Sequence, residues 1–519
     1  MCCTPLLAAV RTVRKPREGR TAPDAGRLLM ADLLIMASGI VSQVILTQIF
    51  SQSEYGRWVI AIDLLRTLFL LAELGQPSFL LREIPRNLNR TNFFILRSGG
   101  MQIAATLALL IPAIALITYT VAPSSSTSEW YVITPLFVLA VGIAVLGYNP
   151  KVTLRAVGRA DLEGYVRILS PLMFMTTLFV IQSFESPRFV HVVLGYLMAN
   201  SISFFISLIL ILPYMSPPPS QNIDQVSDYN MLRLFREGLP YLVATALTPL
   251  AFRMDKFILA AAYTGGFTSV AVYNIAQMVF IASLAAPLAI RGGMTPIFSR
   301  MHDDTDSAIN EIETTLRSII FLLPIGLIIG TGLIVSLLPH LFSMEYITPI
   351  DGGVGALTVC MILLPGWIFA MLSAPAIAFI QAQKEAWKLT ILFGIAVAVN
   401  SIIGLLLIPT IGLVGAAIST VIMHLSLVVV SWSMVERKFG NEFSRPTSIL
   451  PASLTAILLI IIGVLNTYQK AWSSYFPVAW FIILVCGAFI SGWRPKIPEQ
   501  LRELLFSPSK SDFEVGDDE

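Results

Sequence analysis

Three charged residues, Arg253, Asp255 and Lys256, lie deep inside the apolar stretch 238–263. A helix of that length rises roughly 1.5 Å per residue and can cross the roughly 30 Å hydrocarbon core of a bilayer. A charge at that depth costs about 3 kcal/mol or more, so it normally faces a watery cavity or an oppositely charged partner. Arg253 and Lys256 are three positions apart and therefore share a helix face. We expect Asp255 to point elsewhere, towards a neighbouring helix.

Two prolines, Pro240 and Pro249, weaken the same stretch and favour a helix that bends. An alternative interpretation places the charges at the end of a shorter helix, with Lys256 reaching up to the membrane surface. The apolar run 257–263 separates the charges from the next polar loop, which favours the first interpretation.

A second group of charges lies in the stretch 57–81, where Asp63, Arg66 and Glu73 are embedded among apolar residues. The helical angle is about 60° from Asp63 to Arg66 and about 20° from Arg66 to Glu73, which predicts that all three share one face. If both stretches cross the membrane, the two charged groups lie at a similar depth, roughly 9–15 Å below the outer surface. They can face a common cavity, or they can form a salt-bridge network that closes an outer gate. The pattern leaves both interpretations open.

The composition is that of a membrane protein with many spans. Of the 519 residues, 55% are hydrophobic and 13% are charged, whereas a soluble domain is nearer to about 25% charged. The mean hydropathy is +0.77. The four cysteines and four histidines do not have the spacing of metal ligands, so we expect no metal and no other cofactor.

The apolar runs predict an all-α polytopic membrane protein with about fourteen transmembrane helices. Their predicted ranges are 29–50, 57–81, 95–121, 130–149, 162–183, 189–213, 238–263, 270–290, 317–341, 353–380, 388–408, 412–435, 449–466 and 475–493. With a cytoplasmic N-terminus, 28 of the 34 Lys and Arg residues fall in cytoplasmic segments, three in outer loops and three inside spans. Basic loops stay in the cytoplasm, so this bias predicts a cell-membrane protein with both termini cytoplasmic.

The spans predict two pseudo-symmetric six-helix lobes followed by two C-terminal helices. The first and seventh spans both follow an amphipathic basic segment, and a short outer loop joins each to a span rich in small residues. The predicted parts are a cytoplasmic N-terminal tail at 1–28, an N-lobe at 29–213, a cytoplasmic linker at 214–237, a C-lobe at 238–435, a helix pair at 436–493 and a cytoplasmic C-terminal tail at 494–519.

Several segments resemble those of one transporter family. They are SQSEYGRWVIAIDLL at 51–65, ELGQPSFLLREIPR at 73–86, RMDKFILAAAYTGGFTSVAVYNIAQ at 253–277, AIRGGMTPIFSR at 289–300 and IPTIGLVGAAIST at 408–420. Their order and spacing resemble the polysaccharide or O-antigen flippases of the multidrug/oligosaccharidyl-lipid/polysaccharide exporter superfamily. The resemblance implies two six-helix lobes around a central cavity and alternating access. It also implies transport of a lipid-linked sugar from the cytoplasmic to the outer leaflet, and it carries no catalytic residues.

A lipid-linked oligosaccharide presents a phosphate or pyrophosphate head, which suits the embedded cations. Arginine binds phosphate with a fork of donors, and lysine supplies a point charge. Asp63 and Asp255 can hold the cations when the site is empty. The candidate cavity residues are therefore Asp63, Arg66, Glu73, Arg253, Asp255 and Lys256. Tyr273, Asn274 and Gln277 are candidate sugar or gate contacts, with polar packing as the alternative.

Two other functions are alternatives. A cation-coupled multidrug exporter of the same superfamily predicts a mainly acidic and aromatic pocket, whereas the embedded charges here are balanced. A membrane glycosyltransferase or polymerase needs a large outer loop with catalytic acids, but the outer loops are short and nearly uncharged, so we expect no enzyme activity. The expected partners are the lipid-linked sugar and the bilayer, with glycan polymerases or glycosyltransferases as candidate protein partners and no nucleic acid.

Overall fold

The structure is a computed structural model. It describes residues 21–85, 91–122, 127–215, 235, 239, 242–243, 246–301, 305–348, 354–383 and 386–439. Every regular element in these ranges is a helix, which confirms the all-α fold class.

The helices differ widely in length. In chain order they are α2 (Thr21–Ile49), α3 (Gln52–Glu73), α4 (Gln76–Glu83), α5 (Thr91–Thr120), α6 (Thr127–Leu146), α7 (Tyr148–Ala156), α8 (Ala160–Gln182), α9 (Phe189–Ile211), the short 3-10 helix η2 (Leu212–Met215), α11 (Met254–Ala262), α12 (Gly266–Ser283), α13 (Ala285–Arg300), α14 (Thr305–Leu341), α15 (Met344–Ile347), α16 (Ala356–Ala382) and α17 (Ala386–Phe439).

Eight helices in the described ranges are long and apolar enough to cross a membrane, so the chain is a multi-pass membrane protein. The predicted spans 388–408 and 412–435 both lie in α17, where Gly412 breaks the helical path with a φ of 55°. A residue without a Cβ is favoured at that angle. The last two predicted spans, 449–466 and 475–493, lie outside the described residues, so the total of fourteen stays a prediction.

The predicted span 57–81 is wrong at both ends. Helix α3 begins earlier, at Gln52, where Ser51 caps its first turn, and it ends at Glu73. Leu74 and Gly75 then take left-handed angles of 51° and 67°, and α4 begins at Gln76. Two successive residues with left-handed backbone angles end a helix. The apolar pattern continues beyond Glu73, but this backbone geometry ends α3 there.

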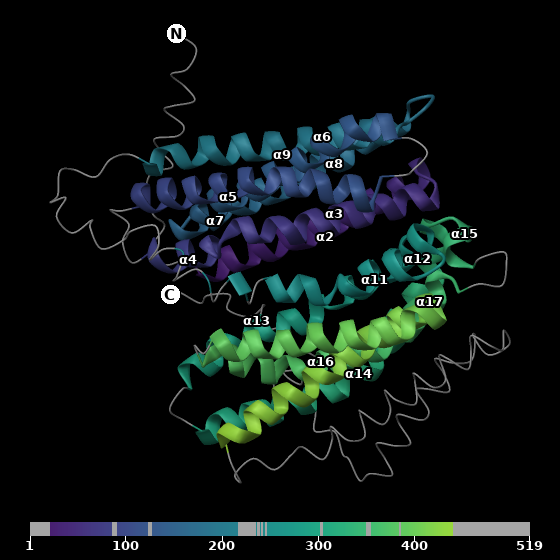
Figure 1. Ribbon diagram of the computed structural model, residues 1–519. Coiled ribbons are helices and arrows are strands. Elements are labelled where there is room, and N and C mark those ends of the chain that lie inside the picture. The colour runs from purple at the N-terminus through teal and green to yellow at the C-terminus, as the bar shows by residue number, and fades with distance from the viewer. Residues whose placement is uncertain are drawn as a thin grey trace, which may run out of the picture. The chain divides into compact units, whose positions relative to one another are not determined.

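The helices α2 to α9 belong to one compact unit, which comprises the described residues up to Ala282 together with 338–348, 354–359 and 386–423. In it α2 packs on α8, α9 packs on α6 and α8, and α3 packs on α5 and α6 (Figure 1). The short helices α4 and α7 meet at one end of the long ones. Their contact is a small apolar core of Phe79, Leu80, Ile84, Phe94, Ala156 and Val157.

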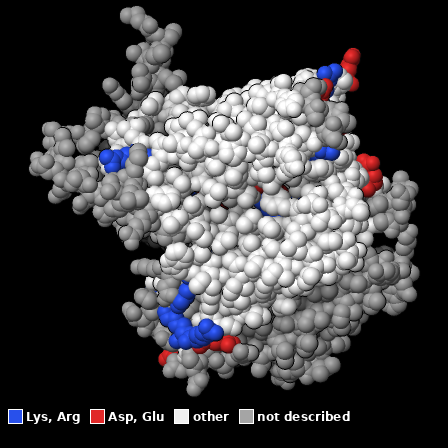
Figure 2. All heavy atoms as spheres, viewed as in Figure 1, with Lys and Arg blue, Asp and Glu red and all other residues white. Residues whose placement is uncertain are grey.

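Helix α5 shows why these elements suit a lipid environment. Its outward stripe is apolar, with Leu107 60% exposed and Ile111 79% exposed. Its buried stripe includes Ser98, Gln102 and Thr106. On the face shown in Figure 2 a broad uncharged surface covers the sides of the helices, with charged atoms mostly near their ends. Apolar side chains outside and polar ones inside are the arrangement that a hydrocarbon solvent favours.

The second compact unit comprises the described residues from 283–337, 360–383 and 424–439. Indole groups tie its helices together, because Trp367 Nε1 donates to the Ser283 carbonyl at 3.0 Å and Trp432 Nε1 donates to the Leu372 carbonyl at 3.1 Å. The predicted division into lobes at 29–213 and 238–435 stays a prediction.

Candidate functional site

The predicted span 238–263 is interrupted just before its charges. Residues 246–251 are helical, Phe252 and Arg253 form a turn, and α11 begins at Met254. The break frees backbone carbonyls that must find other donors at membrane depth. Asn400 Nδ2 donates to the Ala251 carbonyl and Gln277 Nε2 donates to the Phe252 carbonyl, each at 2.7 Å. Two amides from α17 and α12 therefore satisfy the broken backbone.

The break places two cations on the carboxylate of Asp63 in α3. Arg253 Nε lies 3.2 Å from Asp63 Oδ1, and Lys256 Nζ forms an ion pair with Asp63 Oδ2. Arg253 Nη1 also donates to Thr67 Oγ1 at 2.8 Å. All three charged side chains are no more than 15% exposed. Arg253 and Lys256 thus act on one face, as the sequence predicts.

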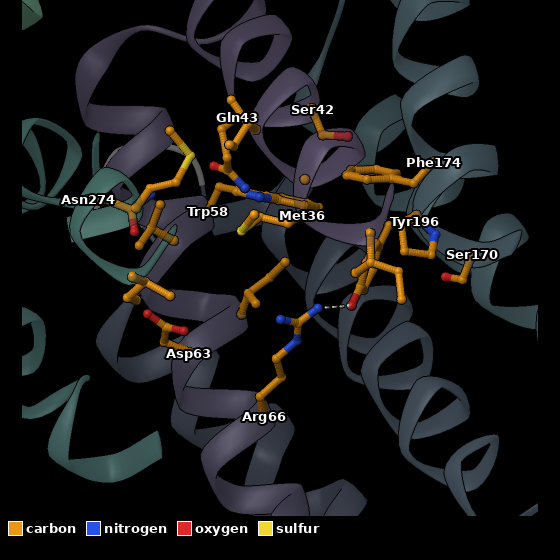
Figure 3. Close-up of a pocket in the computed structure, with 18 of the residues that line it drawn as sticks. Met36, Ser42, Gln43, Trp58, Asp63, Arg66, Ser170, Phe174, Tyr196 and Asn274 are labelled. Atoms are coloured by element: carbon orange, nitrogen blue, oxygen red, sulfur yellow. Dashed lines mark hydrogen bonds between the residues drawn. The ribbon is translucent and has the colours of Figure 1, made fainter. Parts of the chain in front are cut away.

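Arg66 is a third cation, one turn along α3 from Asp63. Its guanidinium donates to the Tyr196 hydroxyl at 3.1 Å, the bond drawn as a dashed line in Figure 3. Within the part of the chain that the structure describes, Arg66 forms no ion pair within 4.0 Å. The site therefore contains three cations, of which Arg253 and Lys256 share the carboxylate of Asp63.

Asp63, Arg66, Tyr196 and Lys256 line a cavity of about 460 Å³ (Figure 3). That volume is within the range of small-molecule sites, which is about 300–1,000 Å³. Side chains from six helices, α2, α3, α8, α9, α11 and α12, form its walls. Its charged and polar lining residues are Ser42, Gln43, Asp63, Arg66, Ser170, Asn200, Lys256 and Asn274.

An aromatic cluster supports one wall of the cavity. Trp58 stacks on Phe137 at 4.9 Å and on Phe174 at 5.9 Å between ring centroids. The Tyr196 ring meets both Trp58 and Phe174 edge to face. Trp58 is only 1% exposed, so it holds the wall in place while Tyr196 directs its hydroxyl to Arg66.

Three of the six predicted site residues, Glu73, Arg253 and Asp255, are not among those that line the cavity. Arg253 reaches the site through its ion pair with Asp63. Glu73 is the last residue of α3. Asp255 is fully buried and accepts hydrogen bonds from the Tyr273 hydroxyl, from Thr420 Oγ1 at 2.8 Å and from the Lys256 backbone N–H at 2.8 Å. Asp255 therefore points to neighbouring helices, as predicted, and anchors α11 to α12 and α17.

Sequence reasoning did not find Tyr55, Gln43 or Tyr196 as parts of this site. Each is a single polar or aromatic residue in an apolar helix, and such residues are common packing elements. Asn274 was a candidate contact, and it does line the cavity. Among the described residues no group of three His, Cys, Asp or Glu side chains is arranged to hold a metal ion.

The helix arrangement defines the class of protein. The lipid II flippase MurJ in an inward closed conformation matches with a TM-score of 0.60 and 15% identity, over 90% of this chain and 99% of the flippase. An inward-facing multidrug resistance MATE family transporter matches with a TM-score of 0.60 and 16% identity, over 78% of this chain and 94% of the transporter. A MOP superfamily transporter from Pyrococcus furiosus, reported with a binding pocket of reversed polarity, matches with a TM-score of 0.55 and 15% identity, over 82% of this chain and 99% of the transporter. The chain has the fold of the MOP superfamily transporters.

The family is narrower than this class. The family model described as polysaccharide biosynthesis protein matches residues 23–302, which is more than half of the chain. The chain therefore belongs to the polysaccharide biosynthesis protein family, and the resemblance seen in its sequence segments is confirmed. No curated protein matches the chain by sequence.

Proposed function

We propose that the protein flips a lipid-linked oligosaccharide, a polysaccharide precursor, from the cytoplasmic to the outer leaflet of the cell membrane by alternating access. The observation that carries this proposal is the excess of cations in the cavity cluster. Asp63 pairs with Arg253 and Lys256, and Arg66 lies one turn further along α3 on the cavity wall, without an ion pair among the described residues. Arg66 carries the surplus positive charge and is exposed on the cavity wall, so an anion that enters the cavity can pair with it.

The phosphate or pyrophosphate of a lipid carrier has the chemistry to be that anion. Arg66 can turn its fork of donors to phosphate oxygens, and Lys256 can contribute a compact positive charge. In the empty cavity Asp63 holds Arg253 and Lys256. A bound phosphate competes with Asp63 for them, so the ion pairs and the substrate site are two states of the same residues.

The remaining cavity surface suits a sugar next to a lipid chain. Ser170, Asn200 and Gln43 offer hydroxyl and amide groups for sugar hydroxyls, while Met36, Ile40 and Met278 offer apolar surface. A mixed lining of this kind fixes orientation with a few polar groups and excludes water with the rest. The membrane itself is the source and destination of the lipid chain.

The alternative is a cation-coupled multidrug exporter, because MATE transporters share the fold. A pocket for cationic drugs needs carboxylates that are free to pair with the drug. The cavity lining contains one carboxylate among the described residues, Asp63, and two cations of the protein already occupy it. The charge balance therefore favours the anionic substrate. We propose no catalytic step for this protein.

The test measures surface glycan in cells that lack the native gene, scored beside the membrane abundance of each variant. We expect Arg66→Ala and the double variant Arg253→Ala, Lys256→Ala to export little or no glycan per molecule of transporter in the membrane. Arg253→Lys should also export little glycan, because lysine lacks the fork of donors with which arginine binds a phosphate. Arg317→Ala is the matched control, since Arg317 lies on α14 with 65% of its side chain exposed and pairs with Glu313 in the same helix.

Full export by the double alanine variant would remove the phosphate role from these residues. Recovery of export when Asp63 is neutralised as well would assign Arg253 and Lys256 to a gate, because a structural ion pair is restored by removing both charges. Phosphate binding is supported if the double alanine variant loses glycan export and export is still lost when Asp63 is neutralised as well.

A further inference from the structure

A chain of hydrogen bonds leaves the charge cluster and crosses three helices. Lys256 Nζ donates to Asn274 Oδ1 at 3.3 Å, and Asn274 Nδ2 donates to the Tyr55 hydroxyl at 2.9 Å. The Tyr55 hydroxyl in turn donates to Gln43 Oε1 at 2.6 Å. Among the described residues, Asn274 therefore links a cation of the cluster, Lys256, to Tyr55.

Tyr55 is also part of a contact at one end of the cavity. Its ring is fully buried and meets the ring of Tyr346 edge to face, with centroids 6.2 Å apart. Beside it, Gln52 Nε2 donates to the Glu345 carbonyl at 3.1 Å. The first turn of α3 is therefore held against α15.

The first turn of α12 completes this contact. A Cβ placed on Gly56 would come within 1.8 Å of the Phe267 carbonyl oxygen, so no larger residue fits here. The Arg57 guanidinium lies over the Phe267 ring, 4.5 Å from its centroid, in a cation–π contact. We call the contact of Tyr55, Gly56, Phe267 and Tyr346 the α3 seal.

We propose that Asn274 is a positioning residue that couples the charge cluster to the α3 seal, so that the seal loosens when Lys256 leaves Asn274. This inference rests on the proposed function, in which a phosphate draws Lys256 to itself. The 3.3 Å bond is the longest in the chain and joins a cation to a neutral amide, so a charge-assisted bond to phosphate outcompetes it. Once Asn274 loses Lys256, its amide can rotate, and Tyr55 loses the donor that orients its ring against Tyr346. An empty cavity stays sealed at this end, and an occupied one can open.

The experiment follows access to the cavity from each face of the membrane. A single cysteine replaces Met36, a half-buried lining residue, in a background without the four native cysteines. A membrane-impermeant maleimide is added to intact cells or to inside-out vesicles. The predicted topology puts the α2–α3 turn outside, so the cysteine should react slowly in cells and faster in vesicles. Gly56→Ala, which cannot close the seal, is the positive control for fast reaction in cells.

We expect Asn274→Leu, Tyr55→Phe and Lys256→Met each to raise the reaction rate in cells about fivefold, the population shift that the loss of one hydrogen bond produces. The double variant Asn274→Leu, Tyr55→Phe should react no faster than either single variant, because both break the same chain. Arg253→Met is the matched control. It also removes a cation from Asp63, but Arg253 bonds to Thr67 and not to Asn274, so the rate in cells should stay unchanged.

An unchanged rate in Asn274→Leu and Tyr55→Phe would overturn the coupling, and so would an equal rise in Arg253→Met and Lys256→Met. Tyr55→Phe removes a single oxygen and carries the test if Asn274→Leu does not accumulate. The labelling needs no transport, so it measures the coupling of Asn274 to the α3 seal separately from glycan export. A seal that opens in Asn274→Leu while the double alanine variant of Arg253 and Lys256 still exports glycan would refute the phosphate role alone.

Discussion

Asp63 is the residue on which the cavity cluster depends most. Each of its carboxylate oxygens faces a different cation, Arg253 on one side and Lys256 on the other. Arg253 has a second partner in Thr67. Removing a charge from a buried pair costs more than the pair itself contributes, because the remaining charge is left without compensation. Neutralising Asp63, Arg253 or Lys256 should therefore lower the stability of the protein by different amounts.

Asp63→Asn should destabilise the protein more than Arg253→Met does. The first change leaves two buried cations without a counter-charge, at a cost of about 3–5 kcal/mol, whereas the second leaves Asp63 paired with Lys256 and costs about 1–3 kcal/mol. The measurement is thermal unfolding of purified protein in detergent, alongside membrane abundance. Equal melting temperatures for the two variants would contradict the shared carboxylate.

At the scale of elements, the broken seventh span explains how cations can stay at membrane depth. A continuous helix would have no free carbonyls and no turn at Phe252. The break exposes polar backbone, and amides from two other helices satisfy it, Asn400 from α17 and Gln277 from α12. The buried carboxylate of Asp255 fixes the start of α11 to the same two helices. The element is thereby held in a rotation that aims Arg253 and Lys256 at Asp63.

Asn400→Leu tests this role of the break. The Ala251 carbonyl would lose its donor in a water-free environment, which costs about 1–3 kcal/mol, and α11 should become less well positioned. We expect a lower melting temperature and reduced glycan export. Ser401→Ala is the control on the same helix, because the Ser401 hydroxyl bonds to the Val397 carbonyl one turn earlier and its loss should be nearly neutral. A Ser401→Ala variant as unstable as Asn400→Leu would show that any change in this helix is damaging.

At the scale of the whole molecule, sidedness decides which leaflet the cavity serves at each step. The distribution of basic residues, with 28 of 34 on one predicted side, predicts that both termini lie in the cytoplasm. The α3 seal would then lie towards the outside, next to the α2–α3 turn. In that orientation the closed end faces the leaflet that receives the substrate.

Reporter fusions test this topology. Fusions after residues 125, 265 and 470 should read as external, and fusions after residues 90, 305 and 440 should read as cytoplasmic, because each pair brackets an odd number of predicted spans. A reversal at any one of these sites would break the fourteen-span prediction. It would also move the α3 seal to the cytoplasmic face and change the side from which labelling of residue 36 is slow.

The sequence alone determined the features that depend on local pattern. Runs of apolar residues are enough to predict helices that cross a membrane, since a bilayer demands length and internal hydrogen bonding from every span. Charges at depth, such as Asp63 and Lys256, stand out because their burial is costly without a partner. The shared face of Arg253 and Lys256 follows from helical spacing. These inferences need no knowledge of which helix lies beside which.

Only the tertiary structure decided which groups meet. Asp63 and Asp255 were both candidate cavity residues, yet Asp63 on α3 lines the cavity, whereas the rotation of α11 after the break buries Asp255 against Tyr273 and Thr420. Tyr55 and Asn274 are 219 residues apart and bond through the packing of α3 on α12. Such contacts depend on the mutual rotation and depth of helices, which arise from side-chain packing along their whole length and leave no trace in the local apolar pattern.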